Sequence, residues 1–475
     1  MAGQVLGTPG FDLQPSAERV ATSQNYITNF DFLNQYLPDT YEKEFERYGN
    51  RTVSAFLRLV GAEMPSMSDQ VTWAEQGRLH TKYVNCASNQ AAAQDAATIT
   101  VNDALVPGSG QIAVRQGQTV FISDNAGGGF NKGLVTGVDY AAGTFDVAYY
   151  EGGGQVFGNT AVLTVFIYGS EFRKGTTGMT ESLEADDVFF NNSPIIIRDL
   201  YEVSGSDMAQ IGWVEISTED GGTGYLWYLK SEHETRLRFD DYLETAMIEA
   251  VPAEGGSGVA ALTSATNVGN KGSEGIFYVV GQRGNVWSGG NPTALADWDA
   301  VISRLDKQGA IEENVVFVDR DFGFDIDDML AAQNSYGAGG TSYGLFDNDE
   351  EMALNLGFTG FRRGYDFYKT DWKYLNDPTM RGGLPTGASS GRVNGLLVPA
   401  GSTSVYDQIL GKNAKRPFLH VRYRASQSED RRYKTWITGS AGGARTSDLD
   451  AMQVNFLSER CVCTLGANNF FLFQE

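Results

Sequence analysis

The chain has 475 residues, 41% of them hydrophobic, which is enough for a core and several subdomains and excludes a disordered chain. Its net charge of −23 argues against nucleic-acid binding over the whole surface, because phosphate contacts need clustered Lys and Arg. The 57 Gly, 22 Tyr and 27 Phe, with only 12 Pro, favour strands, tight turns and long loops over a helical bundle.

Targeting signals and disulfides are not expected. Residues 1–20 lack a basic stretch followed by an apolar one, and no run of about eighteen apolar residues occurs, so we expect neither a signal peptide nor a membrane span, and folding in the cytosol. The three cysteines, Cys86, Cys461 and Cys463, are too few for a disulfide framework. On a strand, the last two would lie at about 6.6 Å between Cα atoms, the upper limit of disulfide reach, so we expect buried apolar side chains.

Residues 1–94 are predicted to form an N-terminal arm, first helices and a strand. The arm, residues 1–36, contains Gly and Pro and has little apolar surface to bury by itself. Residues 39–59 have the apolar spacing of one or two helices broken near Gly49, and residues 71–84 are predicted as a strand.

Residues 95–180 are predicted to form an inserted small β-barrel or sandwich. The composition shifts to Gly, Ala, Val, Thr and Asp, and alternating segments separated by turn signals recur at residues 112–122, 134–138, 144–149 and 161–167. Residues 181–222 follow as extended strands, at 188–190, 195–203 and 211–216.

Residues 224–251 form the one long helical pattern, within a segment 223–274 that also contains the following linker. Apolar positions near three-and-four spacing predict a buried stripe of Leu226, Leu229, Leu237, Leu243, Ala246, Met247 and Ala250, with His233 among them. Thr223 is the expected cap, and Pro252 ends the helix. At about 1.5 Å per residue the helix would be roughly 40 Å long, which suits a spine.

The remaining chain is predicted as a mixed region, residues 275–403, and a β-rich end, residues 404–475. The first contains a buried strand at 275–281, a strand at 314–318, helices at 295–307, 326–333 and 350–356, and a Gly-rich loop at 376–393. Strands follow at 395–398, 418–423, 434–438 and 451–457, and a final hairpin pairs 461–465 with 470–473.

Two kinds of possible catalytic motif occur in the sequence. Ser342 and Ser389 lie in G-x-S-x-G patterns, but in Gly-rich loops without the preceding strand and following helix that a nucleophile elbow needs. Asp319, Asp321 and Asp325 follow a predicted strand and suit a hard cation, although Asp325 and Asp327 fit helix caps better.

A basic cluster lies near the C-terminus. It consists of Lys412, Lys415, Arg416, Arg422, Arg424, Arg431, Arg432 and Lys434. In a chain of net charge −23, we expect these residues to meet the acidic surface of a neighbouring copy more readily than phosphates.

The order of these elements, an arm, a strand pair, one spine helix, a mixed αβ region and a β-rich end, resembles the major capsid protein of tailed double-stranded DNA phages, the Hong Kong 97 fold. The resemblance spans nearly the whole chain and includes the C-terminal stretch from Arg431 to Phe473. It implies an α+β fold in which residues 225–251 are the spine helix, 188–216 part of an extended loop, 275–403 the axial region, and 404–475 with the spine the peripheral region.

The resemblance also implies the function. The chain would be a structural subunit that assembles into hexamers and pentamers of an icosahedral or prolate head shell enclosing double-stranded DNA. Expected partners are scaffold and portal proteins and a decoration protein, with no membrane. The location would be the virion capsid, assembled in the host cytoplasm. No catalytic, cofactor-binding or metal-binding residue is expected.

Two other functions stay open from the residues. One is a cytosolic hydrolase that uses Ser342 or Ser389, or a metal held by Asp319, Asp321 and Asp325. The other is a tail or adhesin protein whose β module at 95–180 binds glycans.

Overall fold

The computed structural model describes most of the chain from Ala62 onward. The described residues are 62–77, 80–89, 95–102, 112–152, 157, 162–179, 182–184, 187–209, 216–217, 223–224, 227–262, 268–309, 311–334, 359–385, 387, 391–407, 412–443 and 445–475. The arm, the helices expected at 39–59 and 350–356, and all but the last residue of the strand expected at 211–216 lie outside these residues.

The chain divides into two compact units, one of residues 1–52, 199–239 and 435–456, the other of residues 53–198, 240–434 and 457–475. Helix α3 (Trp227–Glu249) and strands β10 (Ile195–Ser204) and β22 (Ala451–Thr464) have residues in both units. Helices and strands occur together and strands predominate, so the fold is α+β, as predicted.

A six-stranded mixed sheet in the second unit has the order β13-β23-β17-β14-β16-β15. Its strands are β13 (Asn285–Trp287), β14 (Glu313–Val318), β15 (Gly360–Arg363), β16 (Tyr365–Asp371), β17 (Val393–Pro399) and β23 (Phe471–Gln474). Strand β17 is buried along its whole length, because the sheet is covered on both faces. Leu396 and Val398 belong to one core cluster and Leu397 to another.

Helices cover the two faces of this sheet. They are α4 (Ile276–Arg283), α5 (Leu295–Gln308), α6 (Arg320–Asn334) and α7 (Lys373–Asn376), with short 3-10 turns η5 (Arg381–Gly383) and η6 (Ala467–Asn469). One core cluster joins α4 to the end of α3, and the other joins α5 to α6. Trp298 of α5 is fully buried, with Phe322, Phe361 and Phe367 around its ring.

Several predictions for this region are wrong. Residues 275–281 form helix α4 instead of a strand, since a short apolar run does not distinguish the two. Helix α6 begins at Arg320, so Asp325 and Asp327 lie inside the helix and cap nothing. Strands β22 and β23 make no hairpin, because β23 pairs with β13 and β17 while β22 pairs with β20.

A second sheet has the order β1-β20-β22-β10, with β21 paired to β22. Its further strands are β1 (Ala62–Ser66), β20 (Leu419–Arg424) and β21 (Lys434–Gly439). Strand β22 is continuous over the gap between residues 457 and 461, where the sequence predicted two strands. The charged residues of that gap are paired: Glu459 binds Arg431 at 2.8 Å, and Arg460 binds Glu63 of β1 at 3.3 Å.

Part of the basic cluster near the C-terminus forms ion pairs within the chain, and its contact with a neighbouring copy stays a prediction. Arg424 bonds Asp69 and Glu459, Arg432 bonds Glu63, and Lys434 bonds Glu429. The side chains of Lys412, Lys415 and Arg416 lie outside the described residues.

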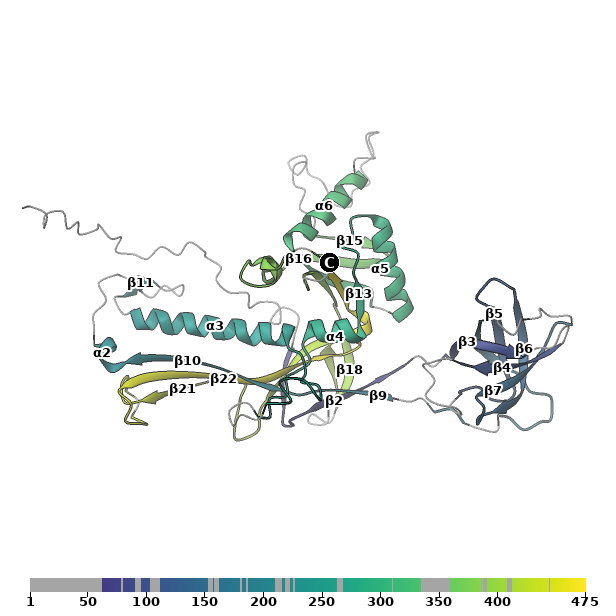
Figure 1. Ribbon diagram of the computed structural model, residues 1–475, viewed down its shortest axis with the longest axis horizontal. Coiled ribbons are helices and arrows are strands. Elements are labelled where there is room, and N and C mark those ends of the chain that lie inside the picture. Colours follow the sequence, from purple (N-terminus) through teal and green to yellow (C-terminus); the bar gives the residue numbers. More distant parts are fainter. Residues whose placement is uncertain are drawn as a thin grey trace, which may run out of the picture. The chain divides into compact units, whose positions relative to one another are not determined.

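Helix α3 is a single long helix (Figure 1), starting at Trp227 instead of directly after Thr223, which lies in a short strand. Leu243 and Met247 of the predicted stripe are buried, but the stripe is centred on Thr235 and Phe239, which the apolar spacing missed. At the end of α3, Glu249 accepts from Arg381 Nε at 2.6 Å and from the Tyr374 hydroxyl at 2.5 Å. Burial first, and then the Glu249 carboxylate, raise the pKa of Tyr374.

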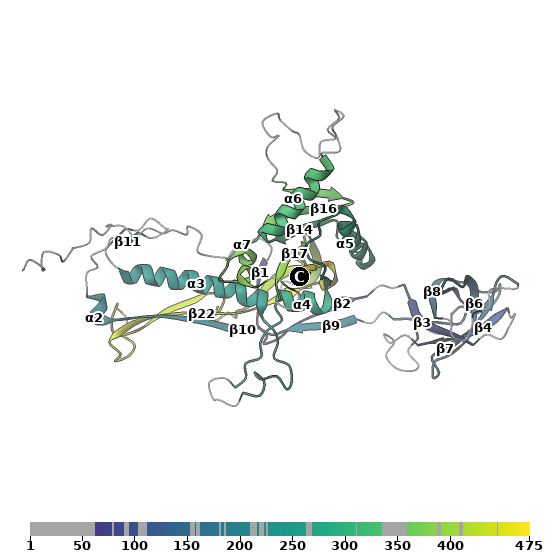
Figure 2. The ribbon, with the colours of Figure 1, turned by 45° about the horizontal axis from the view of Figure 1, so that its top comes forward.

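A closed six-stranded barrel of order β3-β4-β7-β6-β5-β8 occupies the region between β2 (Val71–Gln76) and β9 (Asp187–Asn192) in the sequence. Its strands are β3 (Lys82–Asn89), β4 (Ala96–Val101), β5 (Gln118–Asp124), β6 (Phe130–Asp139), β7 (Thr144–Tyr149) and β8 (Leu163–Ser170). Figure 2 shows its strands surrounding a common centre, which is filled by an apolar core of its own. The single strand predicted at 71–84 is therefore two strands, β2 and β3.

The other elements are short. They are α2 (Gly205–Met208), β11 (Ile216–Ser217) with β12 (Thr223–Gly224), and the hairpin of β18 (Ser402–Asp407) with β19 (Lys412–Pro417). In the first unit, Arg238 forms a two-hydrogen-bond ion pair with Asp199, and the ring of Phe239 packs 5.6 Å from that of Phe456.

Helix α6 offers a matched test of the aromatic core. Phe322 is fully buried beside Trp298, whereas Phe324, two residues along, is 56% exposed. We expect Phe322→Ala to lower the free energy of unfolding by about 3–5 kcal/mol, because it leaves a cavity. Phe324→Ala should change it by about 0.5 kcal/mol or less. Urea denaturation followed by circular dichroism measures both, and equal losses would contradict the assignment of the core.

Candidate functional site

The candidate site is the base of the two-stranded ribbon formed by β2 and β9 (Figure 1). The strands are antiparallel, with Trp73 opposite Phe190 and Glu75 opposite Val188. Because side chains alternate along a strand, these four residues share one face, and Phe189 points to the other. Phe189 is 69% exposed and Val188 is 53% exposed, so the ribbon presents apolar surface on both faces.

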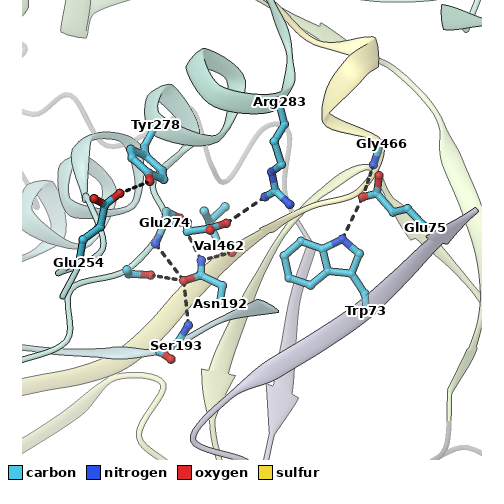
Figure 3. Close-up of polar contacts among 11 residues, drawn as sticks. Trp73, Glu75, Asn192, Ser193, Glu254, Glu274, Tyr278, Arg283, Val462 and Gly466 are labelled. Carbon is cyan, nitrogen blue, oxygen red and sulfur yellow. Dashed lines mark hydrogen bonds and ion pairs between the residues drawn. The ribbon is translucent and has the colours of Figure 1, made fainter. Parts of the chain in front are cut away.

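Asn192, at the end of β9, is the polar centre of the ribbon base (Figure 3). Its Nδ2 donates to the carbonyl oxygens of Glu274 at 2.9 Å and Val462 at 2.7 Å. Its Oδ1 accepts from the Ser193 and Glu274 backbone N–H groups and from the Ser273 hydroxyl. The buried carboxamide thereby joins β9 to the segment before α4 and to β22.

Arg283 of α4 supports the same face of the ribbon (Figure 3). Its guanidinium carbon lies 4.2 Å from the centre of the Phe190 ring and 5.8 Å from that of Trp73. It also pairs with Glu274 at 2.9 Å. Burial raises the pKa of the Glu274 carboxyl, and Arg283 lowers it in part, so the arginine stabilises a carboxylate that the site has withdrawn from water.

Glu75 fixes the β2 strand to the last turn of the chain. Its Oε1 accepts from the Trp73 indole N–H and from the backbone N–H of Gly466, both at 2.9 Å. Between the ribbon and this turn lies a hollow of about 750 Å³, lined by Val188, Phe190, Arg283, Phe418 and Leu465 among others. The hollow can receive an apolar side chain or an extended segment. Among the described residues that line it, none is placed to act in covalent chemistry.

The candidate residues for a metal-dependent hydrolase do not gather into a site. Asp319 is buried, accepts from the Phe322 N–H at 2.7 Å and pairs with Arg392 at 3.2 Å. It is therefore the cap of α6. Burial raises its pKa, against the Phe322 N–H and then Arg392, which lower it. Asp325 accepts from the Asn291 amide at 2.7 Å.

Within the described segments, no three His, Cys, Asp or Glu side chains form a possible metal site. Ser342 and Ser389 lie outside the described residues. Cys86, Cys461 and Cys463 are buried, as expected, and none of the three is in a disulfide. No helix in the described part of the chain has the length and hydropathy that a membrane span requires.

The sequence did not identify Asn192, Arg283 or the Trp73–Glu75 pair. Asn192 stands in Asn-Asn-Ser-Pro at the end of an apolar strand, a motif that indicates a turn. This motif is visible in the sequence, but it does not indicate the hydrogen bonds to residues 274 and 462, which are distant in the chain.

Comparison with known proteins gives only a distant likeness. No protein-family model matches the chain, and no curated protein sequence matches it. A structure from Microbacterium phage Oxtober96 aligns over 94% of this chain and 99% of its own, with 10% identity and a TM-score of 0.38. One from Gordonia phage Cozz aligns over 97% of each chain, with 10% identity and a TM-score of 0.38.

The capsid asymmetric unit of Cyanophage Pam1 aligns over 65% of this chain and 82% of its own, with 13% identity and a TM-score of 0.34. Because these TM-scores all lie below 0.5, the likeness alone does not establish the function.

The ribbon base gives a first prediction. We expect Asn192→Ala to lower the free energy of unfolding by at least about 1–3 kcal/mol, because it leaves buried donors and acceptors without partners. Amide hydrogen exchange of β2 and β9 should become faster. Asn191→Ala, at the exposed neighbouring position, should do neither. Unchanged exchange in Asn192→Ala would show that the amide does not fix the ribbon.

The Glu274–Arg283 pair gives a pH prediction. In Arg283→Met the group that lowers the Glu274 pKa is gone, so burial raises that pKa further. A carboxyl whose pKa is higher in the folded state binds more protons there, so stability falls as pH rises from the unfolded value, about 4.3, through the folded pKa. Urea denaturation between pH 4 and 7 should show a steeper fall for Arg283→Met than for the unmodified chain. Adding Glu274→Gln should remove the difference.

Proposed function

We propose that the chain is the major capsid protein of a tailed phage, a structural subunit that assembles into a shell and performs no catalysis. The observation that supports this best is the β2–β9 ribbon. Its base is fixed by buried hydrogen bonds, while Phe189 on the other face is 69% exposed. A rigidly held strand pair with exposed apolar residues is suited to lie on a neighbouring copy.

The energetics of the ribbon favour such a contact. A two-stranded antiparallel pair is only marginally stable by itself in water. Covering a Phe side chain contributes about 1.5–3 kcal/mol, and a neighbour that covers Phe189 gains this for each subunit contact. In a closed symmetric shell the same contact repeats at every subunit, so a modest free energy for each contact adds up to a large stabilisation of the whole shell.

The elements take capsid roles on this proposal. Helix α3 is the spine helix, and the extended loop is the β2–β9 ribbon, which includes residues 71–76 as well as the predicted strand at 188–190. Residues 275–403 form the axial region, and residues 404–475 with α3 form the peripheral region. The segment 95–180, with β3 added at its start, is an insertion within the extended loop.

The partners follow from the same proposal. Subunits form hexamers and pentamers of an icosahedral or prolate shell in the virion, assembled in the host cytoplasm with scaffold and portal proteins, and a decoration protein binds outside. The net charge of −23 keeps the inner wall from adhering to the packaged double-stranded DNA.

Assembly tests the proposal. We expect the full chain, co-expressed with its scaffold protein, to give closed shells or hexamer rings in negative-stain microscopy. Phe189→Ser should reduce the assembled fraction about tenfold or more, because the loss of about 1.5–3 kcal/mol at each contact exceeds the 1.4 kcal/mol of one tenfold step. Circular dichroism and thermal unfolding of the unassembled chain should stay unchanged.

Phe130→Ser is the matched control, because Phe130 is 58% exposed but lies on the barrel. It should leave assembly intact. A chain that stays monomeric at high concentration with the scaffold present would overturn the proposal. Equal assembly of Phe189→Ser and the unmodified chain would overturn the role of the ribbon.

A further inference from the structure

We propose that the inserted barrel binds a neutral saccharide in a hollow on its outer face, next to the β5–β8 strand pair. The hollow has a volume of about 560 Å³, within the range of small-ligand sites. Tyr150 and Tyr168 stand at it, each 49% exposed. The site belongs to the barrel alone and does not depend on shell assembly.

A β-bulge lies at the hollow. Thr119 of β5 pairs with Gly169 of β8, but Val120 pairs with Ile167, so Tyr168 is an extra residue between them. Bulges re-aim side chains and are frequent beside functional sites. Gly169 leaves the space open: a Cβ there would lie 3.2 Å from the Thr119 Oγ1. The bulge thus leaves Tyr168 without a partner on β5, beside the hollow.

A buried hydroxyl at this hollow lacks a partner. Thr119 is only 5% exposed, and among the described residues its Oγ1 has no hydrogen-bond partner. Thr119 lines the hollow, and a hydroxyl both donates and accepts hydrogen bonds, as the hydroxyls of a sugar do.

The other polar groups suit a neutral, polyhydroxylated ligand. Glu151 and Glu171 offer carboxylates and Lys132 an ammonium group, so the hollow carries two negative charges against one positive. An anionic polymer such as nucleic acid is disfavoured by this balance. Sugar hydroxyls, in contrast, donate to carboxylates and accept from an ammonium group.

Aromatic rings supply the apolar part of the recognition. The faces of aromatic rings are electron-rich and attract the weakly positive C–H groups on one side of a sugar ring. The Tyr150 hydroxyl donates to Glu171 at 2.5 Å, which holds both side chains in place. Beside the hollow, Phe121 stacks between Phe130 and Phe166 at 5.1 and 5.0 Å, and extends the aromatic surface for a longer chain of sugars.

The test uses the full chain, fluorescently labelled, on an array of immobilised neutral and anionic oligosaccharides, with a labelled DNA oligonucleotide as a further probe. We expect neutral oligosaccharides to bind. Tyr168→Ala and Gly169→Ala should each weaken binding about tenfold or more, the first by removing a stacking ring and the second by narrowing the hollow. Thermal unfolding checks that both variants still fold.

The matched control is Tyr368→Ala, which removes a tyrosine of similar exposure, 52%, from β16 outside the barrel. It should bind like the unmodified chain. Three results would overturn the proposal: no neutral oligosaccharide bound above background, equal binding by Tyr168→Ala and the unmodified chain, or binding confined to anionic glycans or DNA. None of these three results bears on shell assembly, so each of the two proposals can fail without the other.

Discussion

The buried carboxamide of Asn192 is the contact on which the β2–β9 ribbon depends. Two strands alone cannot hold a defined direction in water, because their few hydrogen bonds and small apolar area barely offset the entropy of ordering them. Asn192 supplies what the strands lack: five hydrogen bonds from one side chain to its own neighbour Ser193, to the segment before α4 and to β22. The ribbon can therefore leave Phe189 exposed without losing its position at the base.

Arg283 adds a second kind of support at the same base. Its planar guanidinium lies over Phe190 while it pairs with the partly buried Glu274, so one side chain satisfies an aromatic face and a desolvated charge together. Lysine has no planar group that could stack on the ring while a second nitrogen pairs with the carboxylate. Arg283 and Glu75 therefore fix the ribbon from the face that carries Phe190, while Phe189 on the opposite face stays exposed.

The sequence predicted those parts of the fold in which local pattern and tertiary contact agree. Helix α5 and strand β14 came out within one residue, because α5 has a clear apolar stripe and β14 a buried strand pattern. Residues 275–281 came out as a strand because a seven-residue apolar run fits either state, and only packing on α3 and the sheet decides. Strand β22 was predicted as two strands, because the polar residues 458–460 interrupt the apolar pattern and the partners of Glu459 and Arg460, Arg431 and Glu63, are distant in sequence. The sequence did not predict the ribbon base for the same reason, since Asn192 forms its hydrogen bonds with residues 274 and 462, which are distant in the chain.

The barrel shows why a ribbon can carry an insertion without losing its own geometry. The last residue of β2, Gln76, pairs with the first residue of β9, Asp187, so the ribbon leaves two adjacent chain ends. The barrel presents two adjacent ends in return, because its first and last strands, β3 and β8, are hydrogen-bonded to each other. A domain whose ends lie together can be inserted with little strain on its host. The barrel also closes its own sheet and fills its own core, so it needs no contact with the ribbon to fold. Its outer face is therefore not needed for packing, and aromatic residues can stay exposed there, as the proposed saccharide site requires.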